Sequence, residues 1–327
     1  MKAFVTGATG FLGRYIVEQL VARDADVRGL VRKNDDHLKD LGVEMVCGDI
    51  RDTAIVRLAC KDVDVVFHTA AIAGIWGPWQ HFHSVNVQGT INVIEGCLNN
   101  RVGRLVYTSS PSVTFDGKDQ MGVDETVPYA SKWLAHYPQT KAIAEQRVLQ
   151  ANGQSDLLTC ALRPHLIWGP RDRHLVPRLL DRARSGRLRR VGDGQNQIDT
   201  VFVTDAARAH LLAAEAMEKG RSVCGRAFFI SQDQPVNCWD WINELLRLAG
   251  LPEVEKSISK AAAWRIGAVC EVLYKSLGLH REPPMTRFLA AQLASSHFFD
   301  IGRAREDFGY TPQISIGDGM RLLANSW

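Results

Sequence analysis

A tyrosine and a lysine four residues apart are the side chains in this sequence best suited to proton transfer. They are Tyr137 and Lys141, in the stretch HYPQTK. A free tyrosine has a pKa of about 10, too high for efficient acid–base catalysis near neutral pH. A nearby ammonium group favours the phenolate and lowers that pKa. Residues four apart share one face of a helix, so the spacing predicts that Lys141 activates Tyr137.

A serine pair supplies the second part of this chemistry. Ser110 lies in YTSSPSV, where an apolar run predicts a strand that ends at the two serines. Its hydroxyl could hold a carbonyl oxygen while Tyr137 donates a proton to it. Pro138 is compatible with the first turn of a helix. An ordinary surface pair stays the alternative, since this spacing also arises by chance. Tyr129 and Lys132 are three residues apart and fit the catalytic pattern poorly.

A glycine-rich turn near the start of the chain predicts a dinucleotide site. The stretch TGATGFLG lies between an apolar strand pattern and a helical pattern. Gly7 permits a tight turn, Gly10 lets the backbone approach a pyrophosphate, and Gly13 lets the helix pack on the strand. The helix N-terminus then offers free N–H groups to the phosphates. The residues expected to bind here are Gly7, Thr9, Gly10, Phe11, Leu12 and Gly13.

The end of the second predicted strand favours NADP(H) over NAD(H). NAD sites usually carry an acid there, whereas an arginine accommodates the extra phosphate of NADP. This strand ends in GLVRKND, which places Arg32 at the decisive position and Asp35 too late in the loop. A solvent-facing Arg32 without a ligand is the alternative. Asp49 and Ile50, after the third strand, are expected to lie near the adenine.

Alternating strand and helix patterns predict the fold class. They indicate an α/β protein with a Rossmann-type, doubly wound parallel sheet. We expect residues 1–170 to form the dinucleotide-binding domain, joined by later sheet segments from about 198–232. Residues 171–197 and 233–327 are expected to form a smaller, mixed and mainly helical substrate-binding lobe.

Composition narrows the classes of function and cellular location that remain. The 327 residues are 46% hydrophobic and 23% charged, with a net charge of +3. A nearly balanced charge gives no case for nucleic-acid binding. Seven scattered cysteines without a C-x-x-C motif predict reduced thiols in a cytoplasmic protein. The first strand begins too early to leave room for a signal peptide.

Three further stretches have competing interpretations. Residues 261–279 are apolar but interrupted by charges, so we expect no membrane-spanning helix; the segment either packs on its own protein or lies on a membrane. Eight arginines between 171 and 190 could bind a diphosphate, a carboxylate or an acyl-carrier phosphate, or simply face solvent.

His81 and His83 have no third ligand, so no metal is expected. Trp76 and Trp79 are expected either to cover an apolar substrate or to pack.

Taken together, TGATGFLG, GDIRD, FHTAA, VNVQGT, YTSSPSV, YPQTK and LRPHLIWGP resemble the extended short-chain dehydrogenase/reductases over essentially the whole chain. YTSSPSV, LRPHLIWGP and REPPMTRFLA are similar to the 3β-hydroxysteroid dehydrogenase branch. The resemblance implies that Ser110 is the catalytic serine and that Asn86 supports the active site. It also implies a homodimer. Further positions expected beside the cofactor are Ala70, Ala71, Pro164 and His165.

The function expected from this resemblance is NADP(H)-dependent interconversion of a 3-oxo and a 3-hydroxy group on an apolar substrate. The narrowest expectation is a 2-alkyl β-keto acid of long-chain olefin biosynthesis, free or carrier-linked. A 3β-hydroxysteroid or sterol dehydrogenase and a nucleotide-sugar epimerase are the alternatives. A non-catalytic protein on the same fold is a third class, disfavoured by the complete set of Ser110, Tyr137 and Lys141.

Overall fold

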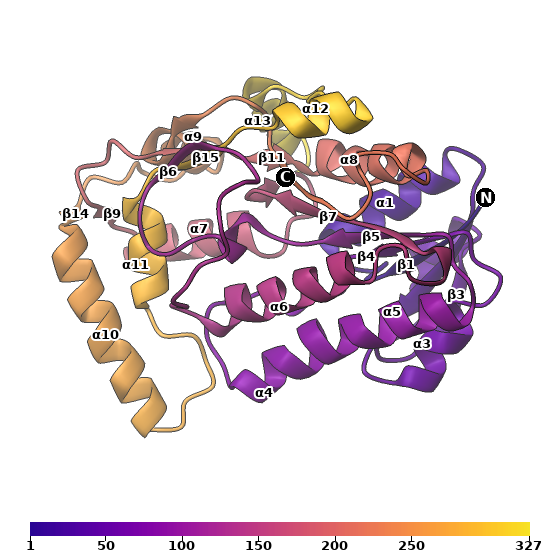
Figure 1. Ribbon diagram of the computed structural model, residues 1–327. Helices are drawn as coiled ribbons and strands as arrows, with labels where there is room; N and C mark the ends of the chain where they lie inside the picture. Colours follow the sequence, from indigo (N-terminus) through magenta and orange to yellow (C-terminus); the bar gives the residue numbers. More distant parts are fainter.

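A seven-stranded parallel sheet forms the centre of the protein in the computed structural model, which describes residues 1–327 (Figure 1). The strand order is β12-β7-β5-β4-β1-β2-β3, so the winding reverses between β1 and β4. Ligands bind at such a switch point, beyond the carboxyl ends of the strands. The strands are β1 Lys2–Thr6, β2 Asp26–Val31, β3 Glu44–Cys47, β4 Val65–His68, β5 Arg104–Thr108, β7 Leu158–Pro164 and β12 Ala227–Ile230.

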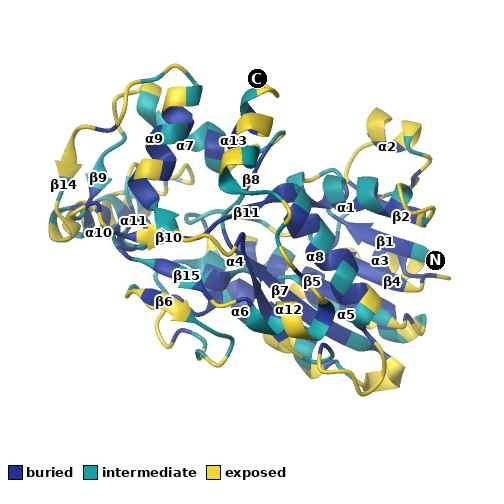
Figure 2. Cartoon of the chain, turned by 90° about the horizontal axis from the view of Figure 1, so that it is seen from above, coloured by how far each residue is buried: buried dark blue, intermediate teal, exposed yellow.

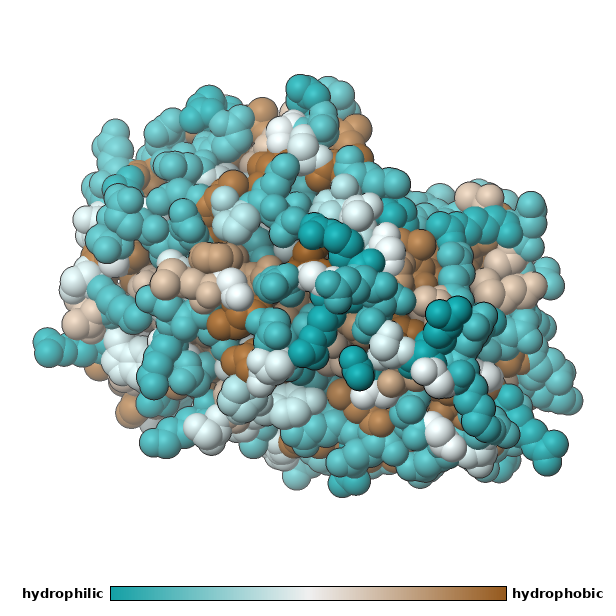
Figure 3. All heavy atoms as spheres, turned by 45° about the horizontal axis from the view of Figure 1, so that its top comes forward, coloured by the Kyte–Doolittle hydropathy of each residue, from teal (hydrophilic) through white to brown (hydrophobic).

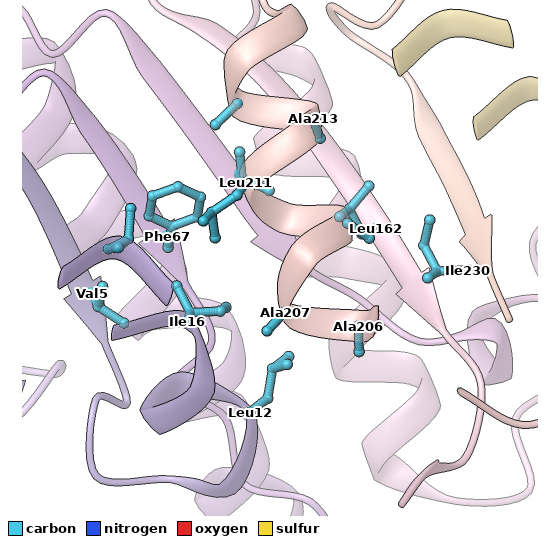
Figure 4. Packing of buried hydrophobic residues seen from close by; sticks show 14 of the residues in the cluster. Val5, Leu12, Ile16, Phe67, Leu162, Ala206, Ala207, Leu211, Ala213 and Ile230 are labelled. Atoms are coloured by element: carbon cyan, nitrogen blue, oxygen red, sulfur yellow. The ribbon is translucent and has the colours of Figure 1, made fainter. Parts of the chain in front are cut away.

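Helices cover both faces of this sheet, which buries its central strands (Figure 2). One face packs against α1 (Phe11–Val21), α8 (Val203–Ala216) and α12 (Gly302–Phe308). The other packs against α3 (Thr53–Ala59), α5 (Gly89–Asn99) and α6 (His136–Gln150). Figure 4 shows the first face, where side chains of α1 and α8 meet those of the strands: Leu12, Ile16, Ala206, Ala207 and Leu211 against Val5, Phe67 and Leu162.

A second lobe stands beyond the carboxyl ends of the strands and contains a four-stranded mixed sheet of order β13-β10-β15-β6. Its strands are β6 Gln120–Val123, β10 Gln197–Ile198, β13 Val236–Asn237 and β15 His297–Phe299. Two short pairs join β8 (Ile167–Trp168) to β11 (Val201–Phe202) and β9 (Arg190–Val191) to β14 (Ser257–Ile258). The other helices are α7 Leu175–Arg184, α9 Cys238–Leu248, α10 Lys260–Ser276, α11 Arg287–Ala294 and α13 Ile316–Ala324.

Shorter elements complete the chain: α2 Asp36–Asp40, α4 Trp79–Phe82, the π-helix His83–Gln88 and the 3₁₀ turns Pro111–Val113 and Gln154–Asp156. The predicted fold class is confirmed, including the mixed second lobe. One strand of that lobe, β6, comes from the first half of the sequence and pairs with β15 near the end. The predicted domain boundaries and the homodimer stay predictions. None of the helices is both long and apolar enough to span a bilayer.

A buried ion pair fastens α6 to the sheet. Arg163 on β7 and Glu145 on α6 are 4% and 0% exposed. The Arg163 guanidinium donates two hydrogen bonds to the carboxylate, at 2.6 and 3.1 Å. The Tyr129 hydroxyl donates a third at 2.7 Å. Because both charges have left water, each depends on the other for compensation.

We predict that Glu145→Ala lowers the free energy of unfolding by about 3–5 kcal/mol, because it leaves the buried Arg163 charge unpaired. The matched control is Glu215→Ala, which removes the exposed partner of Arg23. That change should cost about 0–1 kcal/mol. Urea unfolding of both variants measures the difference, and equal costs would contradict a structural role for the buried pair.

Candidate active site

The glycine loop between β1 and α1 is built for close backbone approach. Gly7 has a φ of 70°, and a Cβ there would lie 2.8 Å from the Thr69 hydroxyl. A Cβ on Gly13 would overlap the Gly7 carbonyl oxygen. Helix α1 starts after Gly10 without a side-chain cap, so its first N–H groups have no side-chain acceptor. This cradle fits a pyrophosphate, because free N–H groups and the helix dipole both favour an anion there.

The other predicted loop residues occupy two environments. Thr9 and Phe11 are partly exposed beside the loop, whereas the Leu12 side chain is buried in the core under the sheet. Leu12 could therefore meet a ligand only through its backbone. At the neighbouring strand end, the Ala70 N–H donates to the Thr6 hydroxyl at 3.2 Å, and Ala71 is exposed.

The end of β2 carries two exposed cations, Arg32 and Lys33. Asp35 already has two partners within the protein. It caps α2 by accepting the Leu38 N–H, and it pairs with Arg14 at 2.5 Å. It is therefore not free to bind a ribose diol.

Asp49 follows β3 nearby, and its pKa falls to about 2. The main cause is its hydrogen bond from Arg51, and Arg32 adds a smaller electrostatic contribution. Ile50 is buried, and its carbonyl accepts a bond from Asn92 at 3.0 Å.

Helix α6 places Tyr137 in its first turn and Lys141 one turn later, as predicted. The Lys141 ammonium donates to the Thr108 carbonyl at the end of β5, with a length of 2.5 Å. It also lies 4.1 Å from the centre of the Tyr107 ring. Burial lowers the pKa of Lys141 to about 7, and the negative charge of Glu145 works against that shift. Lys141 thus joins α6 to the strand that carries the serines.

Tyr137 departs from the expectation in one respect. We expected Lys141 to lower the pKa of this phenol, but in the protein itself burial raises that pKa. The Ser110 hydroxyl, by hydrogen bonding, works in the opposite direction and does not outweigh burial. Removing the phenolate from water raises its free energy here by more than the surrounding polar groups lower it. Tyr137 therefore holds its proton at neutral pH.

Ser110 is half-buried and caps the 3₁₀ turn that follows it. Its oxygen accepts the Ser112 N–H at 3.2 Å and lies 2.9 Å from the Ser112 hydroxyl. Ser109 beside it is buried, and its hydroxyl has no hydrogen-bond partner. The structure thus brings Ser110, Tyr137 and Lys141 together at the carboxyl end of β5.

Asn86 supports this arrangement from a π-helix, a distortion that is frequent at functional sites. Its side chain accepts the Ile72 N–H at 2.8 Å and donates to the Thr140 hydroxyl at 3.1 Å. Thr140 in turn bonds the Tyr137 carbonyl at 3.0 Å. Asn86 therefore braces the first turn of α6 from behind. The role of Thr140 was not anticipated, since nothing in its spacing distinguishes it from other threonines.

His165 is held in a buried chain of polar groups. Its Nδ1 lies 2.5 Å from Asp199, and its Nε2 lies 3.1 Å from Nδ1 of His297. The other nitrogen of His297 faces the Gln292 carbonyl and must donate to it. Nδ1 of His297 is then an acceptor, because burial lowers the pKa of His297 to about 3 and keeps it neutral. Nε2 of His165 therefore donates to His297, and its Nδ1 faces the Asp199 carboxylate.

This chain links β7 to the second sheet, since Asp199 also accepts the Phe299 N–H at 3.0 Å. Pro164 is the last residue of β7 and directly precedes His165. That these two residues lie near a nicotinamide ring stays a prediction.

A cavity of about 370 Å³ opens beside the first turn of α6. Trp76 closes one side, where its indole N–H donates to the Leu279 carbonyl at 2.9 Å and its ring meets Tyr274 edge-on. Neither Tyr137 nor Ser110 lines the cavity. Its walls combine apolar and charged groups, among them Ile75, Trp133, Leu134, His136, Lys275 and Arg287.

The other singled-out residues have structural partners. Tyr129 bonds Glu145, and Arg171 pairs with Glu18. Arg178 and Arg182 are half-buried and share Glu282. Trp79 packs against the rings of His83 and His136. No group of three or more His, Cys, Asp or Glu side chains could hold a metal ion.

Residues 4–259 match the family described as the 3-beta hydroxysteroid dehydrogenase/isomerase family. The chain belongs to this family. A 2-alkyl-3-oxoalkanoate reductase of Stenotrophomonas maltophilia is 50% identical to it, covering 100% of this chain and 99% of the relative. A protein of the same name from Shewanella oneidensis is 46% identical, covering 99% and 86%. The crystal structure of gox2253 superposes with a TM-score of 0.81 at 27% identity, covering 99% and 97%.

The resemblance found in the sequence is therefore confirmed. As a member of this family, the chain is an oxidoreductase of the extended short-chain dehydrogenase/reductase type that acts on CH–OH groups.

We predict that Gly13→Ala destabilises the protein by about 1–3 kcal/mol, because the new methyl group overlaps the Gly7 carbonyl and forces the loop to move. Gly317→Ala is the matched control, since Gly317 also lies in the first turn of a helix but has open space around it. The control should be neutral or stabilising by up to about 1 kcal/mol. Thermal unfolding compares them, and an unaffected Gly13→Ala variant would contradict the close packing.

The buried Lys141 predicts a pH dependence of stability. Its pKa is about 7 when folded and about 10.4 when unfolded. Between these values the unfolded chain binds more protons, so stability should rise with pH. Relative to Lys141→Met, the wild type should gain up to about 1.4 kcal/mol per pH unit from about pH 7.5 to 9. Urea unfolding across that range measures the difference, and a constant difference would show that Lys141 is not desolvated.

Proposed function

We propose that this protein is an NADP(H)-dependent reductase that converts 2-alkyl-3-oxoalkanoates to 2-alkyl-3-hydroxyalkanoates. The observation that carries the proposal is the grouping of Ser110, Tyr137 and Lys141 at the end of β5. The chain that carries these residues is 50% identical, over its full length, to a protein named for that reaction.

The proposed proton transfer rests on the grouping of Ser110, Tyr137 and Lys141 at the end of β5. The loop of Gly7, Gly10 and Gly13 would hold a nicotinamide cofactor, which would supply hydride to the carbonyl carbon. Tyr137, which keeps its proton at neutral pH, donates it to the carbonyl oxygen, while Ser110 holds that oxygen by a hydrogen bond. Lys141 then stabilises the phenolate that remains, since an ammonium group nearby favours the charged form. The products are an alcohol and the oxidised cofactor.

Two features of the structure support the cofactor and substrate. The cradle of Gly7, Gly10 and Gly13 fits a pyrophosphate, and the exposed Arg32 suits the additional phosphate of NADP(H). The cavity beside α6 combines Trp76 and Leu134 with the cation Lys275. Such a lining suits an apolar molecule that carries a carboxylate.

We predict that Tyr137→Phe lowers kcat by about 10²- to 10⁴-fold, because it removes the proton donor. The variant should still fold and bind NADPH, as followed by nucleotide fluorescence. Tyr129→Phe is the matched control, since that hydroxyl bonds Glu145 and has no part in the reaction. The control should keep turnover within a few-fold of the wild type. A Tyr137→Phe variant with near-normal kcat would overturn the catalytic assignment.

We predict that Arg32→Gln raises the KM for NADP⁺ by about tenfold or more, because a charge-assisted phosphate contact is worth about 1.5–3 kcal/mol. The KM for NAD⁺ should stay nearly constant. Arg57→Gln, an exposed arginine on α3, controls for a general loss of positive charge. Steady-state kinetics with both cofactors measures the change, and equal effects on both would argue against NADP selection by Arg32.

A further inference from the structure

The cavity beside the first turn of α6 contains one positive charge that the protein does not compensate. Its walls include the acid Glu271 and the cations Lys275 and Arg287. Glu271 accepts the Arg287 backbone N–H at 2.7 Å, and its carboxylate also pairs with the Arg287 guanidinium at 2.7 Å. These two charges therefore balance each other. Lys275 pairs with no carboxylate of the protein, so its ammonium is available to a ligand.

The other polar groups of the walls surround this ammonium without adding a fixed charge. Burial lowers the pKa of His136, and the positive charge of Lys275 lowers it further, so His136 is neutral near pH 7. That effect also indicates that the ammonium lies near the first turn of α6, because charge effects weaken with distance. Gln139 and His280 contribute an amide and a second imidazole. An anion beside Lys275 would thus have hydrogen-bond donors as neighbours.

Helix α10, which carries Lys275, is fixed on both sides of the cavity. A Cβ on Gly267 would lie 2.6 Å from the Thr286 backbone, so α10 packs closely against the start of α11, its neighbour in Figure 1. The turn after α10 is tied to the loop after β4, because the Trp76 indole N–H donates to the Leu279 carbonyl at 2.9 Å. Residues 261–279 therefore pack on their own protein along this side, and the cavity has a defined shape.

An exposed lysine is not by itself evidence of a binding site. Figure 3 shows a face of the molecule where hydrophilic side chains predominate, with apolar ones among them. Lys275 differs from an ordinary surface cation because it shares a cavity with the apolar walls formed by Trp76, Leu134 and Tyr274. The volume of about 370 Å³ lies within the range of about 300–1,000 Å³ that is usual for small-molecule pockets. The lining thus suits a ligand with both an apolar and an anionic part.

The charges of the walls favour a carboxylate over a phosphate or a diphosphate. A phosphate is held best by several cations or by a bidentate arginine. Arg287 is the one arginine of the walls, and it is already paired with Glu271. The negative charge of Glu271 would also repel a dianion more strongly than a carboxylate. A single free ammonium therefore matches a ligand with a single negative charge.

We propose that this cavity binds the carboxylate of an apolar acid, with the Lys275 ammonium as its counter-ion and the apolar walls against its hydrocarbon part. In a 2-alkyl-3-oxoalkanoate, the carboxylate and the reacting carbonyl are bonded to the same carbon atom, so both must bind close together. The cavity meets this requirement, because His136 in its wall directly precedes Tyr137.

Lys275 then selects a free acid over an ester or a carrier-linked thioester, since neither of these carries the negative charge. The identification of this acid as the substrate rests on the proposed function, whereas the binding of an apolar carboxylate does not.

Calorimetric titration with an unreactive acid tests the binding without any turnover. Decanoate has no 3-oxo group, and methyl decanoate has the same chain without the charge. The wild type should bind decanoate at least about fivefold more tightly than the ester, as expected for one charge-assisted hydrogen bond. Lys275→Met removes the charge but keeps an unbranched side chain, and it should bind the two ligands equally. Lys275→Arg should retain most of the preference for the acid.

The matched control is Arg265→Met, which removes an exposed cation from the same helix outside the cavity. It should bind decanoate like the wild type. Circular dichroism shows whether each variant is folded.

Kinetics with the proposed substrate connects the site to the reaction. When NADP⁺ oxidises a 2-alkyl-3-hydroxyalkanoate, Lys275→Met should raise the KM at least about fivefold and keep kcat within a few-fold. The methyl ester of the same compound should react equally with the variant and the wild type. A lysine with a merely structural role would change both substrates alike. Absence of turnover in every protein would contradict the proposed function, while the decanoate titration would still decide the binding site.

Three results would overturn the proposal. The first is that the wild type does not bind decanoate, or binds it no more tightly than methyl decanoate. The second is that Lys275→Met keeps the preference for the acid. The third is that uridine diphosphate binds more tightly than decanoate and that Lys275→Met weakens its binding, which would assign the cavity to a diphosphate.

Discussion

One buried ammonium group orders the candidate active site of this protein. Lys141 has left water almost completely, and its position is set by the Thr108 carbonyl and the Tyr107 ring. Both partners belong to β5, so the contact fixes the first turns of α6 over the end of that strand. Tyr137 lies one turn before Lys141 and Glu145 one turn after it, on the same side of the helix. A half-buried phenol, a buried ammonium and a buried carboxylate thus follow one another along one side of the helix.

Burying these charged and polar groups is unfavourable, and the surrounding side chains of the site compensate for it. Glu145 is neutralised by Arg163, and it also offsets part of the desolvation of Lys141. Asn86 and Thr140 satisfy the polar groups around the start of the helix. The same burial that lowers the pKa of Lys141 raises that of Tyr137. A tyrosine that holds its proton is suited to act as the acid in the reducing direction, which agrees with the proposed reaction.

Much of this arrangement could be predicted from the sequence, because it depends on local patterns. The glycine loop, the helix that carries Tyr137 and Lys141, and the strand before Ser110 all lie within short stretches of chain. The direction of the Tyr137 pKa shift could not be predicted, since desolvation depends on what surrounds the ring. The chain of His165, Asp199 and His297 also escaped notice, because its members are far apart in the sequence.

The cavity could not be predicted from the sequence for the same reason. Its walls come from three separate segments, near residues 75, 135 and 275. Trp76 was expected either to cover a substrate or to pack, and its bond to the Leu279 carbonyl depends on a pairing 203 residues apart in sequence. The exposed side of α10 also could not be predicted from the sequence. Periodicity identifies the apolar positions of a helix but not which of them other elements cover.

The most direct test of the central claim follows the hydrogen atom itself. A 2-alkyl-3-hydroxyalkanoate that carries deuterium on C3 is incubated with the purified protein and NADP⁺, and both products are examined by mass spectrometry. Our account predicts one deuterium in the reduced cofactor and a matching amount of 3-oxo acid or of the ketone it forms on losing carbon dioxide. It also predicts that Tyr137→Phe transfers deuterium at least about 10²-fold more slowly. An unlabelled cofactor, together with activity on nucleotide sugars and a retained NAD, would contradict the account and assign the same fold to an epimerase.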